Sequence, residues 1–247
     1  MKLCVLGATG NSGLRLVAEG LRRGHEVTAV ARNPRDLASR FADAKVATVD
    51  FSSFSDLVAV MRGHDVVINA AGHVGSPDQF IRLVADVTDA ASEALGPGGR
   101  FWMFAGAALL DVPGTDRMTV TLPGVPKIFA PHVANYRKAQ SSNLAWSILC
   151  PGPMIDSPDG RAHDELAVSA EHWPVPRPAI TRYLPSLATS LAFKKAIGRM
   201  TVYYEDAAKV ILDNLGQDAF VGQRVGLALP EGMTLDKPGY QTRPEPR

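Results

Sequence analysis

The chain has few cysteines, no excess of either charge and no long uninterrupted apolar run. Only Cys4 and Cys150 occur among the 247 residues, each in an apolar run typical of a buried strand. We therefore expect reduced thiols in a reducing compartment rather than a disulfide framework. No spacing of His, Cys, Asp or Glu resembles a metal site, so no metal is expected.

The charge balance argues against whole classes of partner. Lys plus Arg total 26 and Asp plus Glu total 25, which gives a net charge of +1. Such a chain has no basic field to gather nucleic acid or anionic lipid. It also lacks a signal segment at its start and any run of about 18 apolar residues that would span a bilayer. We expect a cytoplasmic protein with no membrane or nucleic-acid partner.

Short β-rich runs alternate with segments of helical period, which predicts an α/β fold with helices on both faces of a parallel sheet. The first helix has Leu14, Val17, Ala18 and Leu21 at helical spacing, so these four are expected to face the sheet. A Rossmann-like, doubly wound domain is predicted over 1–235, with a tail at 236–247. The expected strands are 2–6, 26–31, 45–49, 65–70, 100–105, 145–150 and 223–229.

Two long segments depart from this alternation. Residues 106–131 are apolar yet rich in glycine and proline, and residues 151–185 contain seven prolines. Both follow strands that should end at the ligand-binding edge of the sheet, so they are expected to be lids or binding walls. With the next helical segment, 106–131 and 151–200 form the predicted substrate side, including a small C-terminal substrate-binding region.

The stretch GATGNSG at residues 7–13 lies between the first strand and the first helix. In a dinucleotide-binding turn the first glycine allows the sharp bend, the second allows a pyrophosphate to approach, and the third allows close packing. The helix N-terminus adds free amides and partial positive charge. A purely structural turn is the alternative. The predicted cofactor residues here are Gly7, Thr9, Gly10, Asn11, Ser12 and Gly13.

The residue that follows the second strand discriminates between the two nicotinamide dinucleotides. An acidic residue there binds the ribose 2′-OH of NAD(H), whereas an arginine pairs with the 2′-phosphate of NADP(H). This chain has Arg32, so NADP(H) is favoured over NAD(H). A solvated surface arginine is the alternative.

Together with Ala31-Arg32-Asn33-Pro34, Val49-Asp50-Phe51 and Asn69-Ala70-Ala71-Gly72, the glycine loop resembles the atypical short-chain dehydrogenase/reductases. The likeness is to the NAD(P)H-binding group that includes NmrA-like regulators and flavin/biliverdin reductase B-type enzymes. It implies that Asp50 and Phe51 lie by the adenine and that Asn69, Ala70, Ala71 and Gly72 lie near the ribose and pyrophosphate. It also implies that Pro151 and Gly152 lie above the nicotinamide. Asp50 could instead be an ordinary turn residue, and Asn69–Gly72 a small-residue strand exit.

The usual catalytic set of short-chain dehydrogenases is absent. No serine follows Phe104, and the position four beyond Tyr136 is Gln140 rather than lysine. Lys138, two residues from Tyr136, would point elsewhere on a helix. A tyrosine–lysine mechanism is therefore not expected.

His132 and Tyr136 are the candidate catalytic residues, because a spacing of four places both on one helix face. A histidine beside a nicotinamide could supply a proton while hydride is delivered. The alternative is a capping histidine with a half-buried tyrosine that supports a lid.

Four further features are less specific. His163 and His172 are expected to be exposed loop residues, and Trp173 either lines an aromatic pocket or anchors a packed loop. Residues 182–185 could close over the site.

Two functions fit these observations. The first is an NADPH-dependent reductase that transfers hydride to a small carbonyl, quinone or flavin-like substrate. The second is a non-catalytic sensor of NADP(H) that signals to a protein partner, which the missing catalytic set favours.

Overall fold

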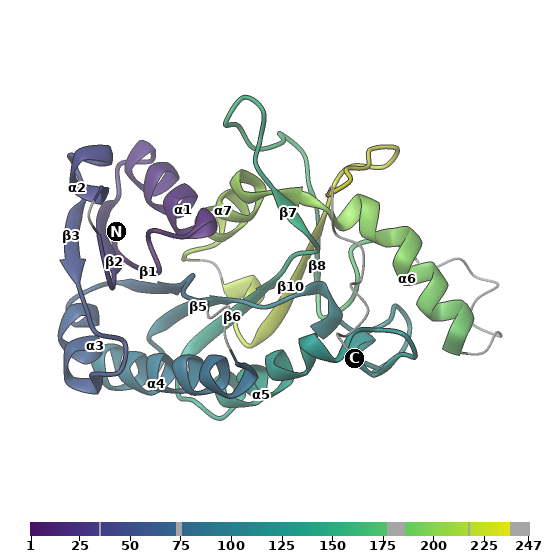
Figure 1. The fold of residues 1–247 in the computed structure, drawn as a ribbon, viewed down its shortest axis with the longest axis horizontal. Coiled ribbons are helices and arrows are strands. Elements are labelled where there is room, and N and C mark those ends of the chain that lie inside the picture. Colours follow the sequence, from purple (N-terminus) through teal and green to yellow (C-terminus); the bar gives the residue numbers. More distant parts are fainter. Residues whose placement is uncertain (35, 73–75, 177–185, 217, 238–247) are drawn as a thin grey trace.

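The computed structural model describes residues 1–34, 36–72, 76–176, 186–216 and 218–237 (Figure 1). Within these residues the main sheet has eight strands in the order β3-β2-β1-β4-β5-β6-β10-β8. The strands are β1 (Lys2–Leu6), β2 (Glu26–Ala31), β3 (Lys45–Thr48), β4 (Val66–Asn69), β5 (Arg100–Phe104), β6 (Ala145–Cys150), β8 (Ala167–Ala170) and β10 (Gln223–Ala228). Every pair is parallel except β10 with β8.

The order 3-2-1-4-5-6 is that of a Rossmann-like doubly wound sheet, as predicted. The chain moves outward from β1 to β3 and then returns across β1 to place β4 on its other side. Such a reversal leaves a crevice beyond the carboxyl ends of β1 and β4, where the loops diverge. That crevice is therefore the expected ligand site.

Helices cover both faces of the sheet (Figure 1). One face is covered by α1 (Asn11–Arg22) and α7 (Tyr204–Asp213), and the other by α3 (Phe54–Met61), α4 (Pro77–Leu95) and α5 (Ala130–Gln140). The short α2 (Leu37–Arg40) lies beside β2 and β3, and α6 (Ser186–Met200) lies at the opposite end of the molecule. In the described residues no helix is long and apolar enough to cross a membrane.

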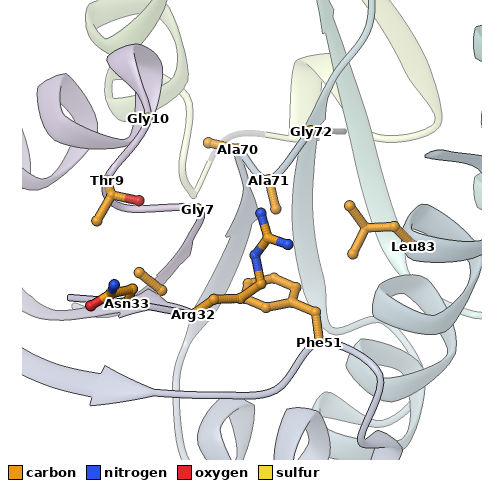
Figure 2. A pocket seen from close by; sticks show the side chains of 11 residues that line it. Gly7, Thr9, Gly10, Arg32, Asn33, Phe51, Ala70, Ala71, Gly72 and Leu83 are labelled. Carbon is orange, nitrogen blue, oxygen red and sulfur yellow. The ribbon is translucent and has the colours of Figure 1, made fainter. Parts of the chain in front are cut away.

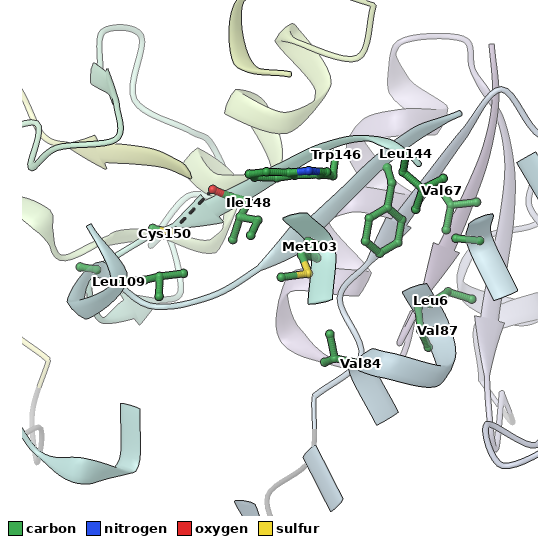
Figure 3. Close-up of a cluster of buried hydrophobic side chains, with 14 of the residues drawn as sticks. Leu6, Val67, Val84, Val87, Met103, Leu109, Leu144, Trp146, Ile148 and Cys150 are labelled. Atoms are coloured by element: carbon green, nitrogen blue, oxygen red, sulfur yellow. Dashed lines mark hydrogen bonds between the residues drawn. The ribbon is translucent and has the colours of Figure 1, made fainter. Parts of the chain in front are cut away.

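Each face of the sheet has its own apolar core. The core under α3, α4 and α5 contains Met103, Trp146, Ile148 and Cys150 (Figure 3), and the one under α1 and α7 contains Leu16 and Trp102. Cys4 and Cys150 are both free and buried, and burial raises the pKa of the Cys4 thiol to about 12. Both thiols are therefore protonated at neutral pH.

The stripe predicted for α1 is partly wrong. Leu16 and Val17 are fully buried, together with Gly13 and Gly20, whereas Ala18 is exposed. The apolar count misses the two glycines: Gly13 packs on the loop after β1 and Gly20 packs on the sheet, so the buried face is rotated toward them.

The proline-rich segments contain more regular structure than their composition predicts. Residues 106–131 form three short 3₁₀ turns, η1 (Ala107–Leu109), η2 (Thr119–Thr121) and η3 (Lys127–Phe129). Residues 151–185 include β7 (Met154–Ile155), which pairs with β9 (Val202–Tyr203), and β8, which joins the main sheet. A last turn, η5 (Asp218–Phe220), precedes β10. The two-residue and four-residue strands are too short to show an apolar period.

Candidate functional site

A pocket of about 370 Å³ occupies the crevice between β1 and β4 (Figure 2). It is formed by residues at or just beyond the carboxyl ends of four neighbouring strands, β1 to β4, and by one residue of α4. Its lining consists of Gly7, Thr9, Gly10, Ala31, Arg32, Asn33, Phe51, Ala70, Ala71, Gly72 and Leu83. Eight of these are residues that the sequence predicts to bind the cofactor. Ala31, Asn33 and Leu83 were not predicted, and Leu83 has no signal beyond the ordinary helical period of α4.

Gly7 allows the sharp turn and a close contact between two loops. Its φ is +75°, a backbone conformation that favours glycine, and a Cβ there would lie 2.6 Å from the Ala71 backbone nitrogen. Any side chain would push apart the loops that follow β1 and β4. The first glycine of the motif therefore fixes the width of the crevice.

Gly13 performs a different task inside the first turn of α1. A Cβ at this position would overlap the Gly7 carbonyl oxygen and lie 2.8 Å from the Ala8 Cα. Helix and loop are thus in backbone contact, which is the close packing expected of the third glycine.

The N-terminus of α1 opens on the pocket beside Gly10. Gly10 is the N-cap residue and has no side chain with which to bond the first helical amides. The first amides of a helix have no intrahelical partner and carry partial positive charge. Those of Asn11, Ser12 and Gly13 are therefore suited to an anionic ligand such as a pyrophosphate.

Arg32 lies directly after β2 and lines the same pocket, where its exposed side chain projects beside Phe51 (Figure 2). Asp50, in contrast, is outside the lining and forms an ordinary turn. Ser52 donates to Asp50 Oδ1 from its backbone nitrogen (2.9 Å) and from its hydroxyl (2.8 Å). These bonds lower the pKa of Asp50, to which the Arg32 charge adds a smaller lowering. The adenine role of Asp50 stays a prediction.

Asn69 supports the pocket from beneath. It is 2% exposed, and its Oδ1 accepts a hydrogen bond of 3.0 Å from the Ala71 backbone nitrogen. Asn69 therefore holds the turn whose residues Ala70, Ala71 and Gly72 line the pocket.

Pro151 and Gly152 lie apart from this lining. Gly152 packs against the end of α6, where a Cβ would lie 2.5 Å from the Met200 carbonyl oxygen. Their nicotinamide role stays a prediction.

His132 belongs to the first turn of α5, and its ring lies beside the segment that follows β5. Its Nε2 is 3.9 Å from where a Cβ of Gly106 would stand, so it faces the segment after β5, which lacks the usual serine. Phe80 and Phe129 flank the ring, with centroids 5.4 Å and 6.4 Å away. This burial lowers the pKa of His132 to about 4. The ring is thus neutral at pH 7 and can only donate or accept a hydrogen bond.

Tyr136 lies one helical turn farther from the sheet edge. Its ring packs on Trp146 of β6 at 5.8 Å between centroids, and its hydroxyl accepts a 2.9 Å bond from Gln140 Nε2. Desolvation raises its pKa, although the Arg224 charge and the Gln140 bond oppose the rise. The structure therefore separates the two predicted catalytic side chains: His132 lies near the edge and Tyr136 beneath it. Their catalytic roles stay predictions.

A buried charge cluster beside Tyr136 was not found from the sequence. Arg224 of β10 is 5% exposed and donates to Asp111 (2.7 Å), to Glu171 (2.6 Å from Nε) and to the Leu109 carbonyl (2.6 Å). Burial lowers the pKa of Arg224, but these carboxylates outweigh it and hold the pKa above its usual value. The sequence feature that could have indicated this cluster is a charged residue, Arg224, inside the otherwise apolar strand β10.

Two minor predictions are resolved by side-chain contacts. His163 was expected to be exposed, which is wrong: its Nδ1 lies 2.9 Å from the fully buried carboxylate of Asp206, and its ring stacks on Tyr203. Trp173 is a packed anchor that is 4% exposed, and its indole N–H donates to Thr119 Oγ1 at 2.6 Å. Residues 182–185, and 238–247 of the predicted tail, lie outside the described residues.

Similarity to known proteins agrees with this geometry. An uncharacterized protein of Bacillus subtilis, YwnB, is 29% identical over 169 residues, which are 63% of this chain and 74% of that protein. The isoflavone reductase homolog IRL of Zea mays is 32% identical over 179 residues, and the match spans 63% of this chain and 55% of the maize protein.

Solved structures share the fold over nearly the whole chain. A protein of Streptococcus pneumoniae described as a candidate NADH-flavin reductase superposes with a TM-score of 0.69, 24% identity and coverage of 93% of this chain and 99% of that one. The anaerobilin reductase ChuY of Escherichia coli O157:H7 gives 0.64, 20% identity and coverage of 94% and 98%. Identities this low establish the fold alone.

The NAD(P)H-binding family matches residues 7–189, a range that begins at the first glycine of the loop and contains every residue of the crevice pocket. The match and the pocket thus point to the same class of ligand. This chain belongs to the NAD(P)H-binding family of Rossmann-like proteins.

Proposed function

We propose that this protein is an NADPH-dependent reductase that acts on a small carbonyl, quinone or flavin-like substrate. One observation carries the proposal: the glycine loop, the Ala70–Gly72 turn and Arg32 line a single pocket at the reversal point of the sheet. The names of related reductases support an oxidoreductase, but the substrate class comes from the chemistry of the site.

The residues present fit a nicotinamide dinucleotide. The backbone at Gly7 and Gly10 leaves room for a phosphate bridge, and the first amides of α1 face the same pocket. Phe51 offers an apolar ring to the adenine side. When bound, the cofactor would supply a hydride to the substrate.

Arg32 supports the choice of NADPH. It occupies the position beyond β2 that meets the 2′-substituent of the ribose in such folds. A guanidinium in that place forms charge-assisted hydrogen bonds with a phosphate and offers no acceptor to a 2′-hydroxyl.

We place the reactive, nicotinamide end of the cofactor toward His132. A neutral imidazole whose Nε2 carries the hydrogen can donate a hydrogen bond to a substrate oxygen as negative charge develops there. Full proton transfer from a neutral ring would leave an imidazolate, so the proton that completes the product comes from solvent. Phe80 and Phe129 keep water away from the ring and favour a planar, apolar substrate.

The experiment is an anaerobic stopped-flow measurement of NADPH oxidation against a panel of quinones, flavins and enones. The same protein is titrated with NADPH, NADP⁺ and NADH by calorimetry. We expect turnover with at least one substrate and saturable binding that favours NADPH. No heat with any pyridine nucleotide would overturn the proposal.

A second function is favoured by one observation: the Tyr136 hydroxyl is bonded by an uncharged amide, that of Gln140. Gln140 occupies the position of the usual lysine, and the segment after Phe104 contains no serine. On this alternative the protein senses NADP(H) and signals to a protein partner. Tight binding of NADPH without turnover on any substrate in the panel would select it.

A further inference from the structure

One backbone amide at the carboxyl edge of the sheet is unpaired. Gly106 follows β5 in an extended conformation, with φ −123° and ψ 158°. The amides on either side of it both donate toward β6. That of Ala105 bonds the Leu149 carbonyl at 2.8 Å, and that of Ala107 bonds the Pro151 carbonyl at 2.8 Å. Within the described part of the chain the Gly106 amide forms no hydrogen bond, so it is a free donor between two anchored ones.

This free amide points toward the crevice. Successive amides of an extended strand point to opposite sides, so the N–H of Gly106 points away from β6 and toward β4. Strand β4 is the neighbour of β5 on that side, and the turn that follows it, Ala70–Gly72, lines the crevice pocket. A ligand that extends from this pocket along the edge of the sheet would therefore pass the Gly106 amide.

Gly106 also leaves space beside its backbone because it has no side chain. A Cβ built there would be 3.6 Å from Phe129 Cδ1 and 3.9 Å from His132 Nε2. These are ordinary van der Waals distances, so the space would accept a methyl group. Gly106 and His132 are both partly exposed, so the space is not sealed within the core. It is bordered by the edge of an aromatic ring and by one polar nitrogen.

The amide and the imidazole are close enough to bind one oxygen together. Standard bond lengths place the amide nitrogen of Gly106 about 2.5 Å from its own Cβ position, and hence at most about 6 Å from His132 Nε2. Two N–H donors that share an oxygen at ordinary distances are up to about 6 Å apart. The proposed function already assigns His132 to the substrate oxygen. The Gly106 amide adds a second donor, whose hydrogen does not depend on a tautomer.

We propose that Gly106 is a catalytic residue: its amide and His132 Nε2 together bind the substrate oxygen that becomes negatively charged, and its missing side chain leaves room for the carbon that carries this oxygen. We call this pair of donors the oxyanion site. The inference rests on the proposed function and deepens it. It favours a substrate that accepts hydride at a C=O carbon over a flavin, which accepts it at a ring nitrogen.

The chemistry of the step explains why two donors help. The substrate carbon gains a hydride from bound NADPH, which becomes NADP⁺, and the electron pair of the C=O π bond moves to the oxygen. A proton from solvent then completes the hydroxyl group. Donors that are already aimed at that oxygen stabilise the charge as it develops, without reorganising at the moment of reaction.

The first test follows the amide itself by nitrogen-15 NMR of the wild-type protein. In the free protein we expect the Gly106 amide hydrogen to exchange rapidly with solvent, whereas that of Ala107, which is bonded to β6, exchanges slowly. The probe is p-nitrophenolate, a planar aromatic oxyanion, added to the NADP⁺ complex. It should move the Gly106 amide hydrogen downfield and protect it, with little change at Ala107. A Gly106 amide that is protected in the free protein, or that does not respond to the probe, would overturn the inference.

The second test fills the space with Gly106→Ala. Alanine adopts this backbone conformation freely and its methyl group fits, so we expect the variant to unfold at the same temperature as wild type or higher. NADPH affinity should be unchanged. Binding of p-nitrophenolate to the NADP⁺ complex, followed by its absorbance, should weaken about tenfold or more, and hydride transfer should slow by a similar factor. Gly216→Ala is the matched control, since a Cβ there meets nothing within 4 Å, and it should behave as wild type throughout.

The outcomes separate this inference from the proposed function. A glycine with only a structural role would give lower stability and unchanged phenolate binding in Gly106→Ala, which would overturn the inference. If the phenolate binds at Gly106 but no substrate in the panel is reduced, the oxyanion site stands and the reductase function fails. If wild type and Gly106→Ala reduce a substrate equally fast, the reductase function stands and the inference fails.

Discussion

The Arg224 guanidinium carbon lies 4.8 Å from the centre of the Tyr136 ring, while its nitrogens bond the carboxylates of Asp111 and Glu171. Glu171 adopts a φ of +64°, which is unusual for a residue with a side chain. These contacts join four distant parts of the chain: the segment after β5, helix α5, the end of β8 and the strand β10.

Removal of Arg224 should therefore be strongly destabilising. Arg224→Met leaves two carboxylates partly buried without their cation, so we expect a loss of about 3–5 kcal/mol in the free energy of unfolding. Urea denaturation followed by circular dichroism measures it. Arg62→Met is the control, because Arg62 is exposed and its nearest carboxylate, on Glu93, is 3.8 Å away. It should cost less than about 1 kcal/mol. Equal losses in the two variants would contradict this account.

Gly13→Ala should weaken cofactor binding. The added methyl group would overlap the Gly7 carbonyl oxygen, so the loop and the first turn of α1 must separate. We expect NADPH affinity, measured by calorimetry, to fall about tenfold or more. Gly216→Ala is the matched control, since a Cβ there meets nothing within 4 Å. Unchanged affinity in Gly13→Ala would show that the loop does not bind the phosphates.

Arg32→Ala tests the choice between the two dinucleotides. The variant loses the charge-assisted bonds to a 2′-phosphate, which are worth about 1.5–3 kcal/mol. We expect NADPH to bind about 10- to 100-fold more weakly and NADH to change little. Arg40→Ala, at an exposed position on α2, serves as the control. Equal weakening of NADPH and NADH would refute the assignment.

His132 should make stability depend on pH. Burial lowers its folded-state pKa from 6.5 to about 4, so the unfolded chain binds the extra proton first as pH falls. Stability is therefore lost between about pH 6.5 and pH 4, by about 3 kcal/mol when complete. His132→Phe lacks this loss. Urea titrations at pH 7 and pH 4 should show wild type losing more stability than the variant. Parallel losses would contradict the low pKa.

The parts of the fold that repeat a period were predictable from the sequence. The strands β1, β2 and β6 lie within their predicted limits because each is an apolar run with turn residues at its ends. The pocket was predictable too, since Gly7, Arg32 and Ala71 all follow strands at the same edge. Local sequence determines these features, so they can be predicted without knowing which distant residues are in contact.

The other features of the site depend on contacts between residues that are far apart in the sequence, and no local pattern predicts which residues will meet. Arg224 meets Glu171 across β10 and β8, and His163 meets Asp206, although more than forty residues separate each pair. Charged residues in a loop and in a strand give no indication of which will pair. The low pKa of His132 likewise comes from Phe80 and Phe129, which only the packing of α4, η3 and α5 brings together.

The sheet also constrains the order in which the molecule can assemble. Strand β8 bonds only to β10 among the described strands, and β10 begins at Gln223, 53 residues after Ala170. That pairing becomes available only after Gln223 and the rest of β10 have been synthesised. The crevice pocket, lined by residues 7–83, can form early, whereas the part of the sheet beyond β6 must wait for β10. A nascent or truncated chain that stops before Gln223 would therefore hold its crevice pocket beside an unfinished edge of the sheet.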